Sequence, residues 1–215
     1  MSPESVTVLI NRMAIVFLGA FNPAIFQPAW FGRHGLLRDA EADAADVELI
    51  HPQLTHFRTE WLEVQVTRDR FMAMSRNGGY EAPLLDLVVG TFTILEHTPL
   101  KMLGMNREVK LQFDTVDRWH NFGHTLVPKD VWRPILDSPG LLGVQMQSPR
   151  GEKDSVLNVF VSATGEKRAD INLNDNRPAL APESAASLMA VLRSSWDAAQ
   201  ADGARIVDQL LALVR

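Results

Sequence analysis

Apolar and polar residues alternate in several short stretches of the chain, which is the pattern of strands with one buried face. The alternation is clearest over residues 61–67 and 107–113. Arg68 and Asp69 allow a tight turn from the first of these stretches into 70–74, so a hairpin is expected there. Three further strands, joined by polar loops that contain glycine, are expected over 141–147, 156–163 and 169–173. The pattern therefore predicts a largely antiparallel sheet.

Helical segments are expected between these groups of strands. Asn22 and Pro23 pair an N-cap residue with proline at the first helical position, which predicts a helix over 22–33, shortened or kinked at Pro28. Further helices are expected over 83–97, 115–126 and 183–214. At 1.5 Å per residue the last of them would be about 48 Å long. A helix of that length either wraps a large sheet or projects to meet a partner.

The same order of elements occurs twice along the chain. Each unit reads strand, helix, several antiparallel strands and long helix, and the two units cover about 13–98 and 99–215. Their residues show no convincing identity, so the duplication is one of pattern. A shared curved sheet with both long helices on one face would bury the apolar side of each element. This arrangement resembles the two-fold saddle of the TATA-binding-protein-like architecture, an analogy of fold that carries no function.

The composition is that of an ordinary globular α+β protein. Of the 215 residues, 46% are hydrophobic and 22% are charged, and a chain of this length buries a core without disulfides or metals. We expect a single globular domain over 13–215, preceded by a loosely held leader over 1–12. The apolar run 13–21 is too short to span a bilayer, and its flanks do not fit a signal peptide. The protein is therefore expected to be soluble and cytoplasmic.

Charge and missing motifs remove several classes of function. The chain has no cysteine, which removes thiolate metal sites, disulfide scaffolds and cysteine nucleophiles. A net charge of −5 and scattered basic residues disfavour nucleic acid, so a nucleic-acid-binding saddle is a third hypothesis that requires a basic concave face. Phosphate loops, dinucleotide fingerprints, nucleophile elbows and zinc-protease motifs are missing. We therefore assign no catalytic residue, cofactor or metal ligand, and favour a non-enzymatic protein.

His120 and His124 form the best constellation for chemistry. Their i,i+4 spacing in a helix places both imidazoles on one face, where they can hold a divalent ion. A third ligand has to come from elsewhere, and the conceivable donors are Asp117, Asp130 and His97. Two ligands do not make a site, so we favour the interpretation in which both histidines flank the packing residues Trp119 and Phe122.

A run of aspartate and asparagine residues late in the chain superficially echoes a calcium loop. Asp175 stands where that loop requires glycine, and Ala181 stands where its bidentate glutamate belongs. The alternation of Asp170, Asn172 and Asn174 is typical of the solvent face of a strand that enters a turn. No calcium site is predicted.

Four of the five tryptophans sit beside apolar periodic positions and are expected to pack in the core. Trp61 is the exception, because strand parity places it with Glu63 and Gln65. An exposed tryptophan on a sheet face can mark an interface.

Residues 97–106 (HTPLKMLGMN) and the earlier Phe21-Asn22-Pro23 resemble uncharacterised bacterial proteins of similar size, in which a T-P-x-x-x-L-G-x-N stretch enters a strand. The resemblance implies a bacterial protein and carries over no activity.

We expect a non-enzymatic binding or assembly subunit that acts through protein–protein contacts, including self-association through the C-terminal helix. One candidate surface is the strand face that bears Trp61 and Phe160. The other is the helix face with Val191, Trp196, Val207 and Leu211. The alternative is a small-molecule- or metal-binding protein or enzyme with a pocket near His120 and His124.

Overall fold

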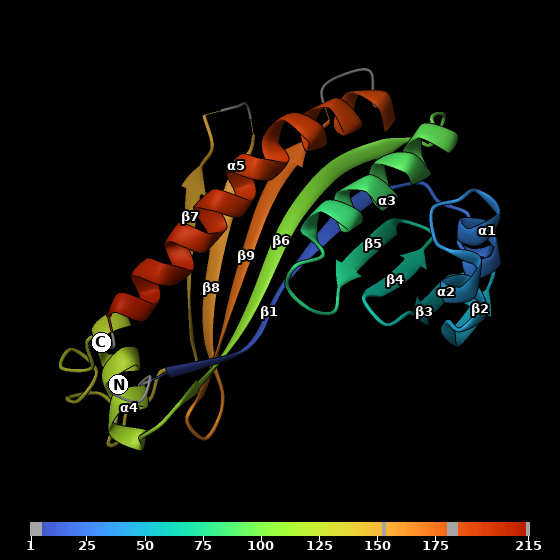
Figure 1. Cartoon of the computed structure of the whole chain (residues 1–215). Coiled ribbons are helices and arrows are strands. Elements are labelled where there is room, and N and C mark those ends of the chain that lie inside the picture. Colours follow the sequence, from blue (N-terminus) through green and yellow to red (C-terminus); the bar gives the residue numbers. More distant parts are fainter. Residues whose placement is uncertain (1–5, 152–153, 180–184, 214–215) are drawn as a thin grey trace.

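Nine strands form one open antiparallel sheet in the computed structural model, which describes residues 6–151, 154–179 and 185–213 (Figure 1). The strand order is β2-β3-β4-β5-β1-β6-β9-β8-β7. The strands are β1 (Val6–Gly19), β2 (Asp46–His51), β3 (Leu54–Arg58), β4 (Leu62–Thr67), β5 (Arg70–Ser75), β6 (Leu100–Phe113), β7 (Gly143–Pro149), β8 (Val156–Gly165) and β9 (Arg168–Pro178). The predicted α+β class and curved antiparallel sheet are confirmed, as is the hairpin, which is β4–β5.

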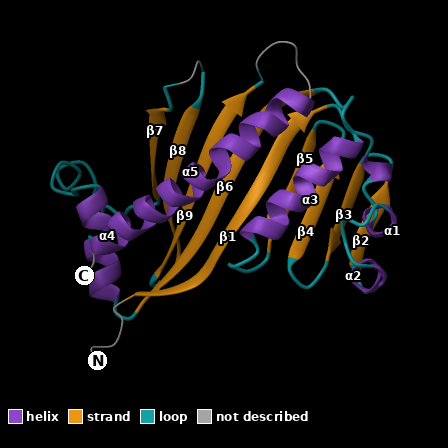
Figure 2. Cartoon of the chain, turned by 45° about the horizontal axis from the view of Figure 1, so that its top comes forward, coloured by secondary structure: helices purple, strands orange, loops and turns teal. Residues whose placement is uncertain are grey.

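Two long helices lie on the same face of this sheet (Figure 2). The helical elements are η1 (Pro23–Ile25), α1 (Pro28–Arg33), α2 (Asp39–Asp43), α3 (Glu81–Ile94), α4 (Val116–Leu126) and α5 (Ala185–Ala212). Helix α3 packs on β1 and β5, while α5 packs on β6 and β9 and also contacts α3. The expected pair of helices on one face is therefore confirmed. We call the opposite face, which no helix of the described chain covers, the open face.

The helix expected over 22–33 is divided into two short pieces. Asn22 caps η1 by accepting a hydrogen bond from the Ala24 backbone, and α1 begins at Pro28. Proline has no N–H to continue a preceding helix, so a new helix starts at that residue. The start expected for the C-terminal helix at residue 183 lies outside the described residues.

Strands β1 and β6 are the longest in the sheet, at 14 residues each, and pair with one another along their length. Reading outward from this pair, β5, β4, β3 and β2 follow on one side and β9, β8 and β7 on the other. The two units thus occupy corresponding positions about the central pair, and β2 has no counterpart among the described strands. Beyond this order of elements, a duplication of the saddle type stays a prediction.

Part of the expected leader belongs to the sheet. Residues 1–5 lie outside the described part of the chain, but residues 6–12 form the first half of β1 and pair with β6. This half of the strand is mostly exposed, and a bulge between Val8 and Ile10 breaks its alternation. Its pattern therefore gave no strand signal.

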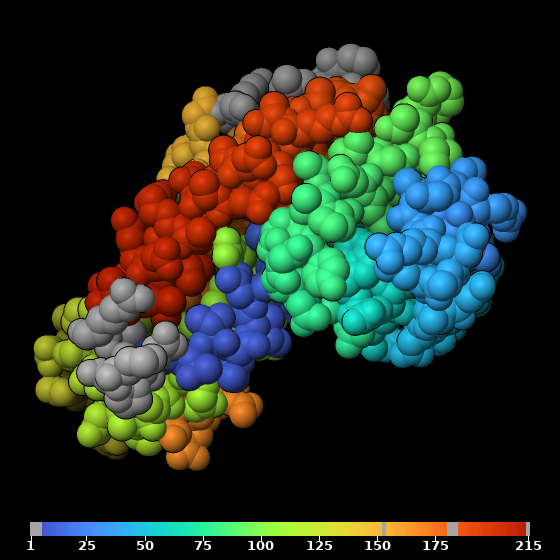
Figure 3. Space-filling model, in the orientation of Figure 1, coloured from blue at the N-terminus to red at the C-terminus, as the bar shows by residue number. Residues whose placement is uncertain are grey.

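Helix α5 joins two separate hydrophobic cores. Leu192 and Trp196 pack in the core of the first unit, and Val207 packs in the core of the second. Between these contacts the helix crosses Arg107, and a Cβ on Gly203 would lie 3.3 Å from the Arg107 Cδ. Gly203 does not interrupt the helix, since α5 is unbroken and forms one continuous ridge along the molecule (Figure 3).

An ion network ties α5 to the sheet and to the connection between β7 and β8. Asp175, in β9, is 3% exposed and accepts from Arg177 at 3.2 Å, while Arg150 lies 3.3 Å from its other oxygen. Arg150 also lies 2.6 Å from Asp202 of α5, to which Arg205 donates at 3.2 Å. Buried carboxylates of this kind hold elements together only while every partner is present.

The variant Asp175→Ala should destabilise the fold by about 3 kcal/mol, because it leaves Arg150 and Arg177 desolvated without the carboxylate they share. Urea unfolding followed by circular dichroism measures the loss. Asp197→Ala, on the exposed side of α5, is the matched control and should stay within about 0.5 kcal/mol of the wild type. Equal stabilities of the two variants would contradict the assigned role of the network.

Asp202 should make the stability of the protein depend on pH in the acid range. Its hydrogen bond from Arg150 lowers the pKa of Asp202, with Arg205 acting in the same direction against the smaller opposing effect of burial. A lowered folded-state pKa means that the ionised group stabilises the fold above the unfolded pKa, about 3.9, and that this contribution disappears as the pH falls through the folded pKa.

The stability difference between wild type and Asp202→Asn should therefore be constant above about pH 5 and close as the pH falls below about 3. Urea unfolding across this range tests it. A difference that does not change with pH would show that the titration of Asp202 is not linked to folding.

Candidate functional site

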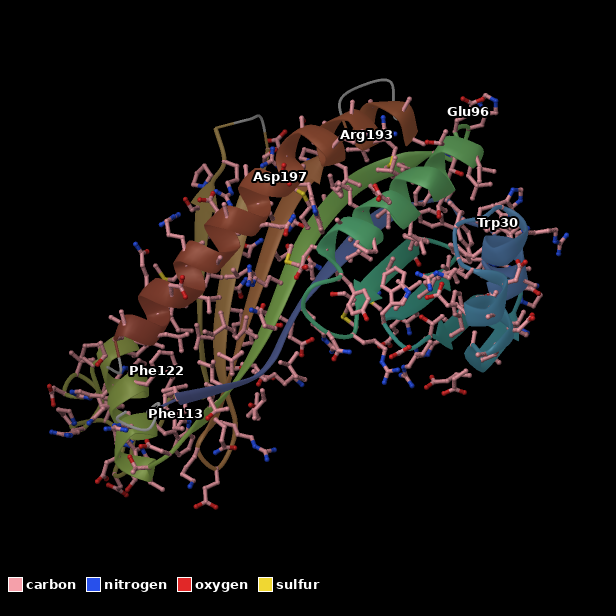
Figure 4. The ribbon with its side chains drawn as sticks, in the orientation of Figure 1. Trp30, Glu96, Phe113, Phe122, Arg193 and Asp197 are labelled. Carbon is pink, nitrogen blue, oxygen red and sulfur yellow. The ribbon has the colours of Figure 1, made fainter. Side chains whose placement is uncertain are left out.

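The apolar face of α5, expected as a docking surface, is used within the fold. Trp196 is 1% exposed and Val207 is 5% exposed, while Val191 and Leu211 are partly buried against the two cores. An interface through these four side chains would require lifting the helix from the sheet. The outward side of α5 carries polar residues such as Arg193 and Asp197 (Figure 4).

Trp61 is buried and Trp132 is exposed, the reverse of what the sequence predicted. The prediction of an exposed Trp61 is wrong, because its side chain is 8% exposed and stacks on Tyr80 with 5.4 Å between ring centroids. Trp61 precedes β4, so the parity of that strand does not apply to it. Trp132, expected in the core, is 44% exposed. Phe160 lies on the open face and is 39% exposed, in keeping with its expected place on a strand face.

Both histidines lie on α4, which Thr115 caps by accepting from the Arg118 backbone. The His120 ring packs against Trp119 at 5.0 Å, and the Nδ1 atom of His124 accepts from the Lys129 backbone at 3.4 Å. No group of three potential metal-binding side chains occurs among the described residues, so Asp117, Asp130 and His97 supply no third ligand there. The helix itself is held by Phe122 against Phe113, with ring centroids 5.4 Å apart (Figure 4).

The aspartate and asparagine run lies on β9 and alternates between the two faces of the sheet. Asp170, Asn172 and Asn174 point to the open face, whereas Asp175 points to the helix side and enters the ion network. The carboxylate of Asp175 and the side chains of Asp170, Asn172 and Asn174 therefore lie on opposite sides of the strand and do not converge on one ion.

The open face of the second unit carries a row of carboxamides. Pairing in register places Asn106, Asn174, Asn158 and Gln147 side by side across β6, β9, β8 and β7. Asn174 donates to Asn106, and Gln147 donates to Asn158 at 3.1 Å. The row is thus hydrogen-bonded within itself and neutral.

Several charges on the open face are arranged as ion pairs. Glu108 lies 2.6 Å from Arg12 and 3.2 Å from Lys110, and in the first unit Arg58 and His56 both contact Glu63. Burial acts to raise the pKa of Glu63, but hydrogen bonds from His56 and Arg58 outweigh it and lower that pKa. Arg12, Lys110 and Arg58 are therefore paired with carboxylates, and the basic face that a nucleic-acid-binding saddle requires is not formed by them.

A cluster of exposed apolar side chains lies where α4 is connected to β7. Six large side chains between residues 131 and 146 are between 44% and 86% exposed: Val131, Trp132, Ile135, Leu136, Leu142 and Met146. We call this cluster the α4–β7 surface. Three of these side chains, Trp132, Leu136 and Leu142, line one hollow. Large apolar groups that are exposed close together are typical of sites of interaction.

The sequence between α4 and β7 explains why these side chains stay outside the core. Pro128, Pro134 and Pro139 prevent a continuous helix, and the segment forms turns closed by bonds such as Ile135 N–H to the Trp132 carbonyl. A chain of successive turns has no single face that can be buried. Sequence reasoning missed this surface because it searched for periodic patterns; the available signal was several large apolar residues among closely spaced prolines.

Two adjoining pockets lie beneath this surface. One, of about 260 Å³, is lined by Trp132, Leu136 and Leu142 together with the first residue of β7. The other, of about 80 Å³, lies between α4 and the sheet, beside His120, and shares Lys129 and the 140–141 segment with the first. A pocket thus lies beside His120, one of the two histidines expected near it, whereas His124 lines neither hollow. Apolar side chains form most of the lining of the pocket beside His120.

Comparison with known proteins yields no match, either to a family model, to a curated protein or to a solved structure. Among the described residues, no helix combines the length and the apolar character needed to cross a bilayer.

Proposed function

We propose that the protein is a non-enzymatic binding or assembly subunit that holds a protein partner on its α4–β7 surface. The observation that carries the proposal is the exposure of six large apolar side chains within one short segment. Fully burying a side chain of this size is worth roughly 1.5–3 kcal/mol, so covering the cluster supplies a substantial driving force for association.

The shape of the surface favours a protein partner over a small ligand. Pockets for small molecules usually measure about 300–1,000 Å³ and enclose most of the ligand. The pocket beside His120 is about 80 Å³ and its neighbour about 260 Å³. Hollows of this size suit single apolar side chains from a partner, and Trp132 at the rim is of the type that dominates the binding energy of interfaces.

The second candidate is a small-molecule-binding protein that uses the pocket beside His120. Trp119, Lys129 and Ser162 also line it, so a few polar groups converge on an apolar hollow. A ligand of this kind would be small and mostly apolar. Its binding would be weakened by His120→Ala, whereas contacts on the outer surface would not depend on that ring.

A double variant, Ile135→Asp/Leu142→Asp, tests the proposed function. Both side chains are at least 70% exposed, so the fold should be retained while the apolar surface gains two charges. The tagged protein is used for affinity capture from an extract of its source cells. A protein partner, or the untagged chain itself, should be enriched by the wild type and reduced at least about tenfold for the variant.

The matched control is Ile50→Asp/Ile94→Asp, which charges two exposed apolar positions on β2 and at the end of α3. It should capture the partner as well as the wild type does. Equal capture by all three proteins, or none by any, would overturn the proposal. Unchanged thermal unfolding of both variants establishes that the comparison concerns binding.

A further inference from the structure

Strand β7 is an open edge of the sheet beside the α4–β7 surface. It ends the strand order, and every residue from 145 to 149 is exposed. Its inner side pairs with β8 from Gly143 to Pro149, and no other strand of the described chain pairs with its outer side. The backbone groups on that side are available to a further strand.

The two edges of the sheet differ in charge. Edge strand β2 carries Asp46, Glu48 and His51, the kind of residue that discourages edge-to-edge pairing. Strand β7, with the sequence GVQMQSP, carries no charged residue. Like charges that face one another across two strands are destabilising, so a residue on the two-fold axis of an edge that pairs with its own copy has to be uncharged.

The sequence of β7 also complements itself when two copies run antiparallel. With the two-fold axis at Met146, Met146 faces its own copy, Gln145 faces Gln147, and Val144 faces Ser148. Gln145 and Gln147 lie on the open face, where their amides can donate and accept across the junction. Met146 lies on the helix side and is 64% exposed, so two thioether chains meet there. Pro149, which lacks an N–H, marks the end of the paired segment.

We propose that the partner of the α4–β7 surface is a second copy of this chain, joined by antiparallel pairing of β7 with β7 about a two-fold axis at Met146. This inference rests on the proposed function and specifies its partner. The axis is perpendicular to the sheet, so the helices of both copies lie on one side and the sheet continues from copy to copy. The exposed Leu142 and Met146 of each copy are then covered beside the junction.

Single cysteines test the pairing, because the chain has none of its own. Facing residues of antiparallel strands have Cα atoms about 4.5 or 5.5 Å apart, both within the range that a disulfide spans. Met146→Cys should therefore give a covalent dimer in a glutathione redox buffer. Formation should be at least about tenfold faster than for cysteines that meet only by collision.

Two control variants distinguish cross-linking in the proposed register from cross-linking by random collision. Ser148→Cys lies on the same exposed edge but faces Val144 of the other copy, so it should not cross-link to itself. Mixed with Val144→Cys, it should form a heterodimeric disulfide. Ile50→Cys, on the β2 edge, should stay reduced. Cross-linking of Met146→Cys no faster than that of Ser148→Cys or Ile50→Cys would overturn the proposed pairing.

Native mass spectrometry of the unmodified chain supplies an independent result. The wild type should be a dimer, and Met146→Lys, which places two ammonium groups at the axis, should be a monomer with an unchanged circular dichroism spectrum. A monomeric wild type, or a dimer that Met146→Lys leaves intact, would refute the β7 junction. If a different protein is still captured and lost only with Ile135→Asp/Leu142→Asp, the proposed function stands and the self-pairing fails.

Discussion

The pairing of β1 with β6 is the constraint on which the rest of the structure depends. Each unit contributes one long strand to this pair, and all other strands are added outward from it. Because this pair joins the two halves of the sheet, the face that α3 covers in the first unit continues into the face that α5 covers in the second. The register of each further strand pair then follows from this central one. The register aligns the ion pairs around Glu63 in the first unit and the carboxamide row that ends at Gln147 in the second.

Much of the fold could be predicted from local patterns, because strands with one buried face and capped helices leave periodic signals. The β4–β5 hairpin and helix α4, expected over 115–126, are examples. The first half of β1 could not be predicted, because a strand that is held by its neighbour while mostly exposed has no apolar alternation. Pairing across distant segments is a tertiary effect that a local window does not contain.

The candidate site was less predictable than the fold, for a related reason. Helical periodicity shows that a helix has an apolar face, but it does not say whether that face meets the sheet or a partner. Trp196 and Val207 meet the sheet. Trp132 was assigned to the core because it lies beside apolar positions, but those positions belong to turns that bury no single face. Trp61 was assigned by the parity of a strand that it only precedes.

The single unbroken path of α5 across both cores has a consequence for how the protein folds. Each core would be left with an uncovered apolar surface if the helix detached, so neither unit retains its packing when the other opens. The helix also follows the nine strands of the sheet in the chain, which means that a ribosome completes the sheet before α5 emerges. Until then the nascent protein leaves uncovered the part of β6, β9 and α3 that α5 contacts, a transiently exposed apolar surface of the kind that chaperones protect.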